Sequence, residues 1–238
     1  MVFYRKDYGR VVFAVIRLPM IRSAEDLTAL VQEVGFLPFF VNDIPGFSIA
    51  ACTPPELWFS ATEDGPWEWK GPVARTKKCL YGKFFRKKAC FVSAELAPDF
   101  LNYRRDGYDF DARFDEGKAF YADRPVFDMV YDHGPITTDC LKDACGYEKG
   151  SKGFDPIVTR LQMQTYLCIS DFIYREDKFG RTYGWGVAQY ATPEQVLGYD
   201  YARSAYCREP EESKARLLEH LKRVLPGEGE RSLLKLIG

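Results

Sequence analysis

The sequence lacks the marks of a membrane-spanning or secreted protein. None of its 238 residues belong to an uninterrupted apolar run of 18 residues, which is the length that would indicate a membrane span. The first ten residues, MVFYRKDYGR, carry charges where a signal peptide needs an apolar core. The seven cysteines are an odd number at irregular spacing, with no C-x-x-C pair, so reduced thiols are expected. We therefore expect a cytoplasmic protein with no membrane association.

Motifs for the common cofactors and metals are also missing. The sequence contains no G-x-G-x-x-G, no P-loop, no H-E-x-x-H and no G-x-S-x-G. Its two histidines, His133 and His220, have no cysteine or aspartate at metal-ligand spacing. Asp109 and Asp111 have D-x-D spacing, but nearby arginines and lysines favour salt bridges and helix caps over a cation site. We predict no metal and no cofactor.

Basic and acidic residues balance over the whole chain, but basic residues are concentrated in one stretch. The net charge is −1, so no global attraction to nucleic acid is expected, while 46% hydrophobic residues suffice for a core. Residues 70–94 contain eight basic residues and no acid, interleaved with aromatic residues. Such a pattern can follow a phosphate backbone and stack on bases, and a solvated charged face is the alternative. The predicted binding residues of this basic stretch are Lys70, Arg75, Lys83, Arg86, Lys87 and Lys88.

Two tryptophans precede the basic stretch in the segment GPWEWKGP, residues 65–72. The two Gly-Pro pairs predict an irregular backbone. In an extended chain Trp67 and Trp69 would share a face, either lining a cleft beside Glu68 or wedging the loop onto the core.

Residues 134–190 have the pattern of helix, turn, helix and β-hairpin. Asp155-Pro156 predicts a helix start, and Ile157 and Leu161 fall on one helical face. Alternating residues on either side of a charged turn with Gly180 then predict a hairpin. This is the order of a winged helix, in which the hairpin is the wing. The pattern of the basic stretch predicts a helix that stops at Gly82, followed by strand, turn and strand. A second, degenerate winged-helix unit therefore remains an open alternative.

The predicted fold class is therefore α+β, built of winged-helix units, one or two in tandem, with C-terminal helices. We divide the chain into residues 1–113, an N-terminal α/β part with the degenerate basic segment, and residues 114–238, the winged helix with C-terminal helices.

The triplet Gln162-Met163-Gln164 lies at the end of the second predicted helix. On a helix the two amides diverge by about 200°, whereas on an extended segment they share a face. If the helix ends before Gln162, both amides could reach one water. Otherwise they are ordinary polar residues at a helix end.

Three of these features together resemble a known family: the unit opening with Gly134-Pro135, the Gln162–Gln164 triplet, and Trp67–Lys70 ahead of a basic hairpin. They are similar to the AlkZ/YcaQ family of winged-helix DNA glycosylases, and more closely to the shorter bacterial proteins described as AlkZ-related. The resemblance spans roughly residues 55 to 200. It implies excision of alkylated or crosslinked bases, with Gln162 and Gln164 as catalytic residues that position the hydrolytic water, and with wing and basic surface holding the duplex.

The expected function is thus a DNA-repair protein whose partner is duplex DNA. Hydrolysis of the N-glycosidic bond of an alkylated base needs little acid catalysis, because the leaving base is already cationic. Glu68 or Asp171 could supply a carboxylate for the oxocarbenium-like centre. Two alternatives remain open: a non-catalytic winged-helix regulator, and a small-ligand or protein-interaction module that uses Trp67 and Trp69.

Overall fold

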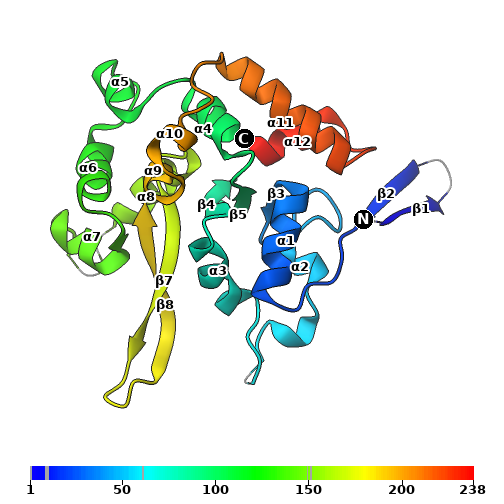
Figure 1. Cartoon of the computed structure of the whole chain (residues 1–238), viewed down its shortest axis with the longest axis horizontal. Helices are drawn as coiled ribbons and strands as arrows, with labels where there is room; N and C mark the ends of the chain where they lie inside the picture. Colours follow the sequence, from blue (N-terminus) through cyan, green and yellow to red (C-terminus); the bar gives the residue numbers. More distant parts are fainter. Residues whose placement is uncertain (1, 9–10, 61, 149, 151) are drawn as a thin grey trace.

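The computed structural model describes residues 2–8, 11–60, 62–148, 150 and 152–238, and its fold is α+β (Figure 1). The chain opens with a hairpin of β1 (Val2–Tyr8) and β2 (Val11–Arg17), which projects from the body at the right of Figure 1. Two compact units follow, each with its own three-stranded antiparallel sheet.

The first unit runs from α1 to β5. Its elements are α1 (Ala24–Val34), β3 (Phe36–Pro38), α2 (Ile49–Cys52), a 3-10 turn η1 (Pro55–Leu57), α3 (Pro66–Arg75), β4 (Cys79–Phe85) and β5 (Lys88–Ser93). Helix α1 begins at Ser23, whose side chain accepts the backbone N–H of Asp26 at 3.0 Å, and it ends at Gly35, where φ is 80°. The strand order of the sheet is β3-β5-β4.

Two helices and a 3-10 turn connect the units: α4 (Ala97–Arg105), α5 (Phe110–Asp115) and η2 (Tyr121–Asp123). Asp109 caps α5 by accepting the backbone N–H of Ala112 at 2.8 Å, and Asp111 forms an ion pair with Arg124. The prediction that this acidic pair serves as cap and salt bridge is confirmed.

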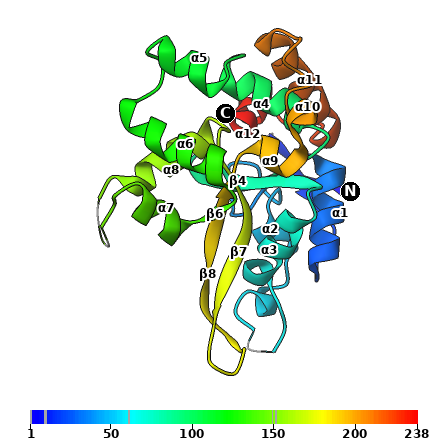
Figure 2. The ribbon, with the colours of Figure 1, turned by 60° about the vertical axis from the view of Figure 1, so that its left-hand side comes forward.

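The second unit runs from α6 to β8. Its elements are α6 (Arg124–His133), β6 (Ile136–Thr137), α7 (Thr138–Ala144), α8 (Phe154–Met163), β7 (Cys168–Glu176) and β8 (Thr182–Ala191). The long β7–β8 hairpin projects downwards from the second unit (Figures 1 and 2). The predicted hairpin is confirmed, and the predicted helix starts one residue earlier than Asp155.

The two units repeat one arrangement. Each has a first helix, a short strand, further helical turns, a last helix and a hairpin, and in each sheet the short strand pairs with the second strand of the hairpin. The strand order β6-β8-β7 is thus the counterpart of β3-β5-β4. The repeat lies in the topology rather than in the residues.

Four C-terminal helices complete the fold: α9 (Pro193–Leu197), α10 (Tyr199–Ala202), α11 (Pro210–Val224) and α12 (Glu230–Ile237). Helix α9 opens with a capping box, in which Thr192 and Gln195 exchange hydrogen bonds of 3.2 and 2.8 Å. Helix α11 packs on α4, and α12 returns to β4 of the first unit.

Each unit packs its hairpin against the last helix of the other. Strand β7 lies against α3, where Arg75 forms an ion pair with Asp171. Strand β4 lies against α8, where the backbone N–H of Lys83 donates to the side chain of Gln162. One continuous set of buried side chains runs through both units. Each last helix thus has one side packed against the hairpin of the other unit.

The segment 65–72 is not irregular, and that prediction is wrong. It forms most of α3, because Gly65 and Glu68 build a capped start in which the Glu68 carboxylate accepts the Gly65 N–H at 3.0 Å. Pro66 sits in the first turn, where its missing N–H is not needed. The helix ends at Arg75, and Gly82 lies within β4 instead of stopping a helix. Burial of Trp69 and Val73 outweighs the cost of Pro72 inside the helix.

Candidate functional site

The basic stretch does not form a single charged face. Lys70 is buried, and its ammonium lies 4.1 Å from the ring centre of Phe172 and 5.1 Å from that of Trp67. Burial lowers the pKa of Lys70. Arg75 is exposed but is paired with Asp171 of β7. These two cations therefore attach the second hairpin to α3.

Three further cations of the basic stretch, Arg86, Lys87 and Lys88, gather at the turn of the β4–β5 hairpin. Arg86 and Lys87 have φ values of 48° and 64°, as the two central residues of a tight hairpin turn do. Lys87 and Lys88 are exposed, and Arg86 pairs with Asp43 at 3.1 Å. Lys83 is half-buried beside Thr159. The hairpin thus presents three positive charges at one end.

The two tryptophans do not share a face. On α3 they diverge, so that Trp69 is buried in the core and Trp67 packs between Trp58 and the exposed Trp185 of β8. The expectation of a common face is wrong because the backbone is helical. The pair fastens α3 to its surroundings and does not line the hollow described below.

The two glutamines also diverge, because the helix runs through Gln162. The side chain of Gln162 has no exposed surface. Its Nε2 donates to the Val158 carbonyl at 3.0 Å, and its Oε1 accepts the Lys83 N–H at 2.9 Å. Gln164 ends α8 and is half-buried, and its Oε1 has no hydrogen-bond partner among the described residues. Gln162 therefore ties α8 to β4, whereas the Oε1 of Gln164 is buried and unpaired among the described residues.

A hollow of about 570 Å³ joins Gln164 to the turn of the basic hairpin; we call it the basic hollow. It lies where α4, the end of α8, α12 and the β4–β5 turn meet. Its lining consists of Arg86, Tyr103, Arg104, Asp106, Met163, Gln164, Lys235 and Gly238. Three cations and one carboxylate line the hollow, so its lining is positive, although Asp43 beside it pairs with Arg86 and Lys235 and offsets part of that charge.

Arg104 is the best-fixed cation of the basic hollow. Its Nε donates to the Met163 carbonyl at 2.9 Å and its Nη1 to the Ile237 carbonyl at 3.0 Å. Lys235 shares the carboxylate of Asp43 with Arg86, at 3.0 and 3.1 Å. Sequence reasoning missed Arg104, Lys235 and Tyr103 as site residues, because only the packing of α4 and α12 brings them to the hairpin.

The cysteines offer no reactive thiol in the core. Cys52, Cys79, Cys90 and Cys168 are buried. Burial raises the pKa of Cys52, Cys79 and Cys90 to about 12, so these thiols stay protonated at neutral pH.

Within the described part of the chain, no group of three or more His, Cys, Asp or Glu side chains is arranged to hold a metal ion. Over the same residues, every helix is too short or too polar to cross a membrane.

Comparison with known proteins identifies the family of the chain. No curated protein and no solved structure is detectably similar to the chain. The model of a family described as AlkZ related matches residues 21–238, which takes in both units and all the C-terminal helices. The chain therefore belongs to the AlkZ-related family.

Proposed function

We propose that this protein repairs DNA by binding a damaged duplex at the basic hollow and hydrolysing the N-glycosidic bond of an alkylated or crosslinked base. Its family points to a role in DNA repair. The observation that carries the proposal is that Gln164 and Arg86 line the same hollow, although they lie far apart in the chain. A candidate water-binding amide and a candidate phosphate-binding cation thus face one space.

We further infer that both units are winged helices and that the chain divides near residues 113 and 114. The repeated element order and the matching strand order support this inference. In that arrangement β4–β5 and β7–β8 are the two wings. With one side of each last helix packed against the opposite hairpin, we assign the DNA contact to the wings and the basic hollow rather than to a recognition helix.

The chemistry assigned to this site needs few groups. A cationic alkylated base is a good leaving group, so the protein has to orient water and stabilise an oxocarbenium-like centre. Gln164 lines the hollow, and we assign to its amide the positioning of that water, while Asp106 supplies a carboxylate in the same hollow. Glu68 caps α3 and Asp171 pairs with Arg75, so neither is assigned a part in the reaction. Gln162 would act by fixing the end of α8.

The first test is catalytic. The protein is incubated with duplexes that carry N7-alkylguanine, and abasic sites are counted after alkaline cleavage. We expect abasic product from the wild type and a loss of about 10²-fold in Gln164→Ala, since one positioned group contributes about that much. Absence of abasic product would reject the hydrolase.

The second test locates the duplex. Changing Lys87 and Lys88 together to Ala removes two exposed cations at the hairpin turn, so binding should weaken and the salt dependence of log Kd should become shallower by up to about two units of slope. The matched control changes Lys77 and Lys78, two exposed lysines at the opposite end of β4, to Ala. Lys77 and Lys87 both have positive φ, so backbone strain is matched as well. Equal losses in both pairs would contradict binding at the basic hollow.

A non-catalytic DNA-binding protein is the second candidate, and the burial of Gln162 favours it. An amide whose donor and acceptor are both engaged within the protein cannot hold a water in this arrangement. This alternative expects the same salt-dependent duplex binding, with no abasic product from any alkylated substrate.

A further inference from the structure

The N-terminal hairpin of β1 and β2 projects away from the two units (Figure 1). Its register runs from Val2↔Arg17 to Tyr8↔Val11, so the two strands pair over their full length. Among the described elements, no third strand extends this sheet. The family model begins at residue 21, so the hairpin lies outside the residues that match the family.

A two-stranded hairpin needs a further partner. By itself it is marginally stable in water, and a third strand or a packed face is usually required. The body of the chain offers no matching edge within its described residues. The edge strands β3 and β6 have three and two residues, and the other two edge strands, β4 and β7, pack against each other.

The two edges of the hairpin differ in charge. Strand β1 carries three consecutive charged residues, Arg5, Lys6 and Asp7. Strand β2 carries none from Val11 to Ile16, where it consists of four β-branched residues, a phenylalanine and an alanine. Charged residues on an edge strand discourage pairing with another chain, whereas an uncharged edge rich in β-branched residues favours it. The edge of β2 is therefore the one open to a further strand.

Strand β2 is also complementary to itself. When two copies meet antiparallel across a two-fold axis at Ala14, all seven residues of each strand are paired. Val12 of one copy then stands opposite Ile16 of the other, and Phe13 stands opposite Val15. Pairs of β-branched residues, and of an aromatic with a β-branched residue, are among those that stabilise antiparallel sheets.

Like charges do not meet in this pairing. Arg17 of one copy falls opposite Val11 of the other. The same operation on β1 would set Arg5 opposite Arg5, and like charges that face each other directly destabilise a sheet. A second copy of the chain brings the matching edge at the same concentration as the first, which no other protein is bound to do.

We propose that the edge of β2 pairs with β2 of a second copy of this chain. The result is a symmetric dimer with one shared antiparallel sheet, in the strand order β1-β2-β2-β1. The dimer does not depend on the proposed repair function, because the hairpin lies outside the basic hollow and outside the family match.

The test is sedimentation velocity of the full chain over a range of about 1–100 μM. One strand pair makes a small interface, so we expect a reversible dimer with a Kd on the order of 10 μM. Ala14→Glu should weaken the dimer by on the order of 10-fold or more, because it sets two carboxylates opposite each other at the axis. Within the hairpin that change places a carboxylate opposite Arg5, which is a favourable pair, so the hairpin itself should be kept.

The matched control is Lys6→Gln. It lowers the net charge by one unit, as Ala14→Glu does, but it lies on β1, and it should dimerise as the wild type does. Ala14→Lys should be weakened like Ala14→Glu, because two ammonium groups would meet. An equal mixture of Ala14→Glu and Ala14→Lys should restore the dimer, since opposite charges then face each other at the axis.

A wild type that stays monomeric over this range would overturn the inference. So would equal dimerisation of Ala14→Glu and Lys6→Gln, and a mixture that fails to recover would reject the axis at Ala14. Amide hydrogen exchange over Val11–Arg17 tells a second copy from other occupants of the edge. Protection should rise with protein concentration. Protection that is the same at every concentration would show that the edge is covered by the body of the chain or not at all, and would reject the dimer.

Discussion

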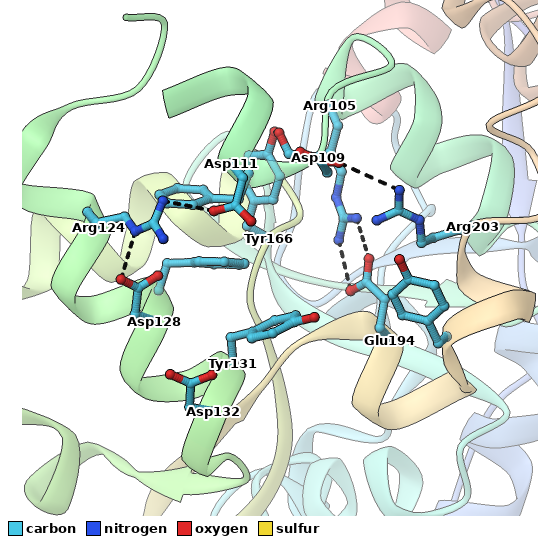
Figure 3. A pocket seen from close by; sticks show the side chains of 13 residues that line it. Arg105, Asp109, Asp111, Arg124, Asp128, Tyr131, Asp132, Tyr166, Glu194 and Arg203 are labelled. Atoms are coloured by element: carbon cyan, nitrogen blue, oxygen red, sulfur yellow. Dashed lines mark hydrogen bonds and ion pairs between the residues drawn. The ribbon is translucent and has the colours of Figure 1, made fainter. Parts of the chain in front are cut away.

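At the residue scale, the Arg105–Glu194 ion pair (Figure 3) is held by several contacts, with Arg105 buried and donating also to Tyr206 and Thr165. Burial tends to raise the pKa of Glu194, but the attraction and hydrogen bonds of Arg105 outweigh it and hold that pKa below its ordinary 4.5. A carboxyl with a lowered folded-state pKa stabilises the fold above its unfolded pKa, and this contribution is lost as pH falls through the folded-state value. Glu194→Gln should therefore cost about 3–5 kcal/mol at neutral pH, since it leaves Arg105 buried and unpaired.

Urea unfolding at neutral pH and at acid pH checks this prediction. The deficit of Glu194→Gln relative to the wild type should shrink as the acid limb is approached, because the wild-type carboxylate becomes protonated there. Glu33→Gln, at an exposed position, should follow the wild type at every pH. A deficit that stays constant with pH would mean that the lost stability is not ionic.

The two glutamines should differ sharply in stability. Gln162→Ala leaves the Lys83 N–H without its acceptor and opens space in the core, so it should cost about 2–4 kcal/mol. Gln164→Ala removes a half-buried side chain at a helix end and should cost less than about 1 kcal/mol. Denaturant unfolding of both variants measures the difference. Any activity lost in Gln162→Ala must be corrected for its folded fraction, whereas a loss in Gln164→Ala reports on the site.

At the scale of elements, the contact of α8 with the β4–β5 hairpin depends on Gly82. A Cβ at this position would come within 2.8 Å of the Phe84 ring and 3.2 Å of Gln162 Oε1. Phe84 is buried and cannot retreat, so Gly82→Ala should destabilise the protein by about 1–3 kcal/mol through overpacking. Gly229→Ala is the control, because nothing lies within 4 Å of its Cβ and its φ is −69°. Thermal unfolding of both variants measures the difference in stability. Equal melting temperatures would show that a Cβ at position 82 does not clash with Phe84 and Gln162.

Local patterns predicted the elements they encode. Alternating residues on either side of Gly180 predict the β7–β8 hairpin, and Asp155-Pro156 predicts the start of α8 to within one residue. The sequence predicted an irregular backbone for the α3 segment because Gly-Pro pairs are typical of turns and loops. The helix forms because Glu68 caps its start and Trp69 is buried in the core.

The candidate site was predictable only in part, for a related reason. Arg86 and Gln164 stand out in the sequence by charge and by spacing. Arg104 and Lys235 reach the basic hollow only through the packing of α4 and α12, which no local pattern expresses.

At the scale of the whole molecule, the reciprocal packing of the two units makes them dependent on each other. Each hairpin buries the last helix of the other unit, and the buried side chains form one continuous cluster. Separating the units would expose α3 and α8 together, so neither unit has a complete surface without its partner. This favours a single cooperative unfolding transition even in a chain of 238 residues.

The tryptophans allow that cooperativity to be tested. All four, Trp58, Trp67, Trp69 and Trp185, lie in the first unit or on the hairpin that contacts it, so their fluorescence reports on that region, whereas circular dichroism reports on all the helices. Leu141→Ala opens a cavity in α7 of the second unit and should cost about 2–5 kcal/mol. If the units unfold together, the fluorescence and dichroism midpoints should fall by the same amount in denaturant. Leu27→Ala in α1 opens a cavity in the first unit and should likewise lower the fluorescence and dichroism midpoints by the same amount. A fluorescence midpoint that stays in place while dichroism is lost early would show that the second unit unfolds alone, and the reciprocal contacts would then contribute little to stability.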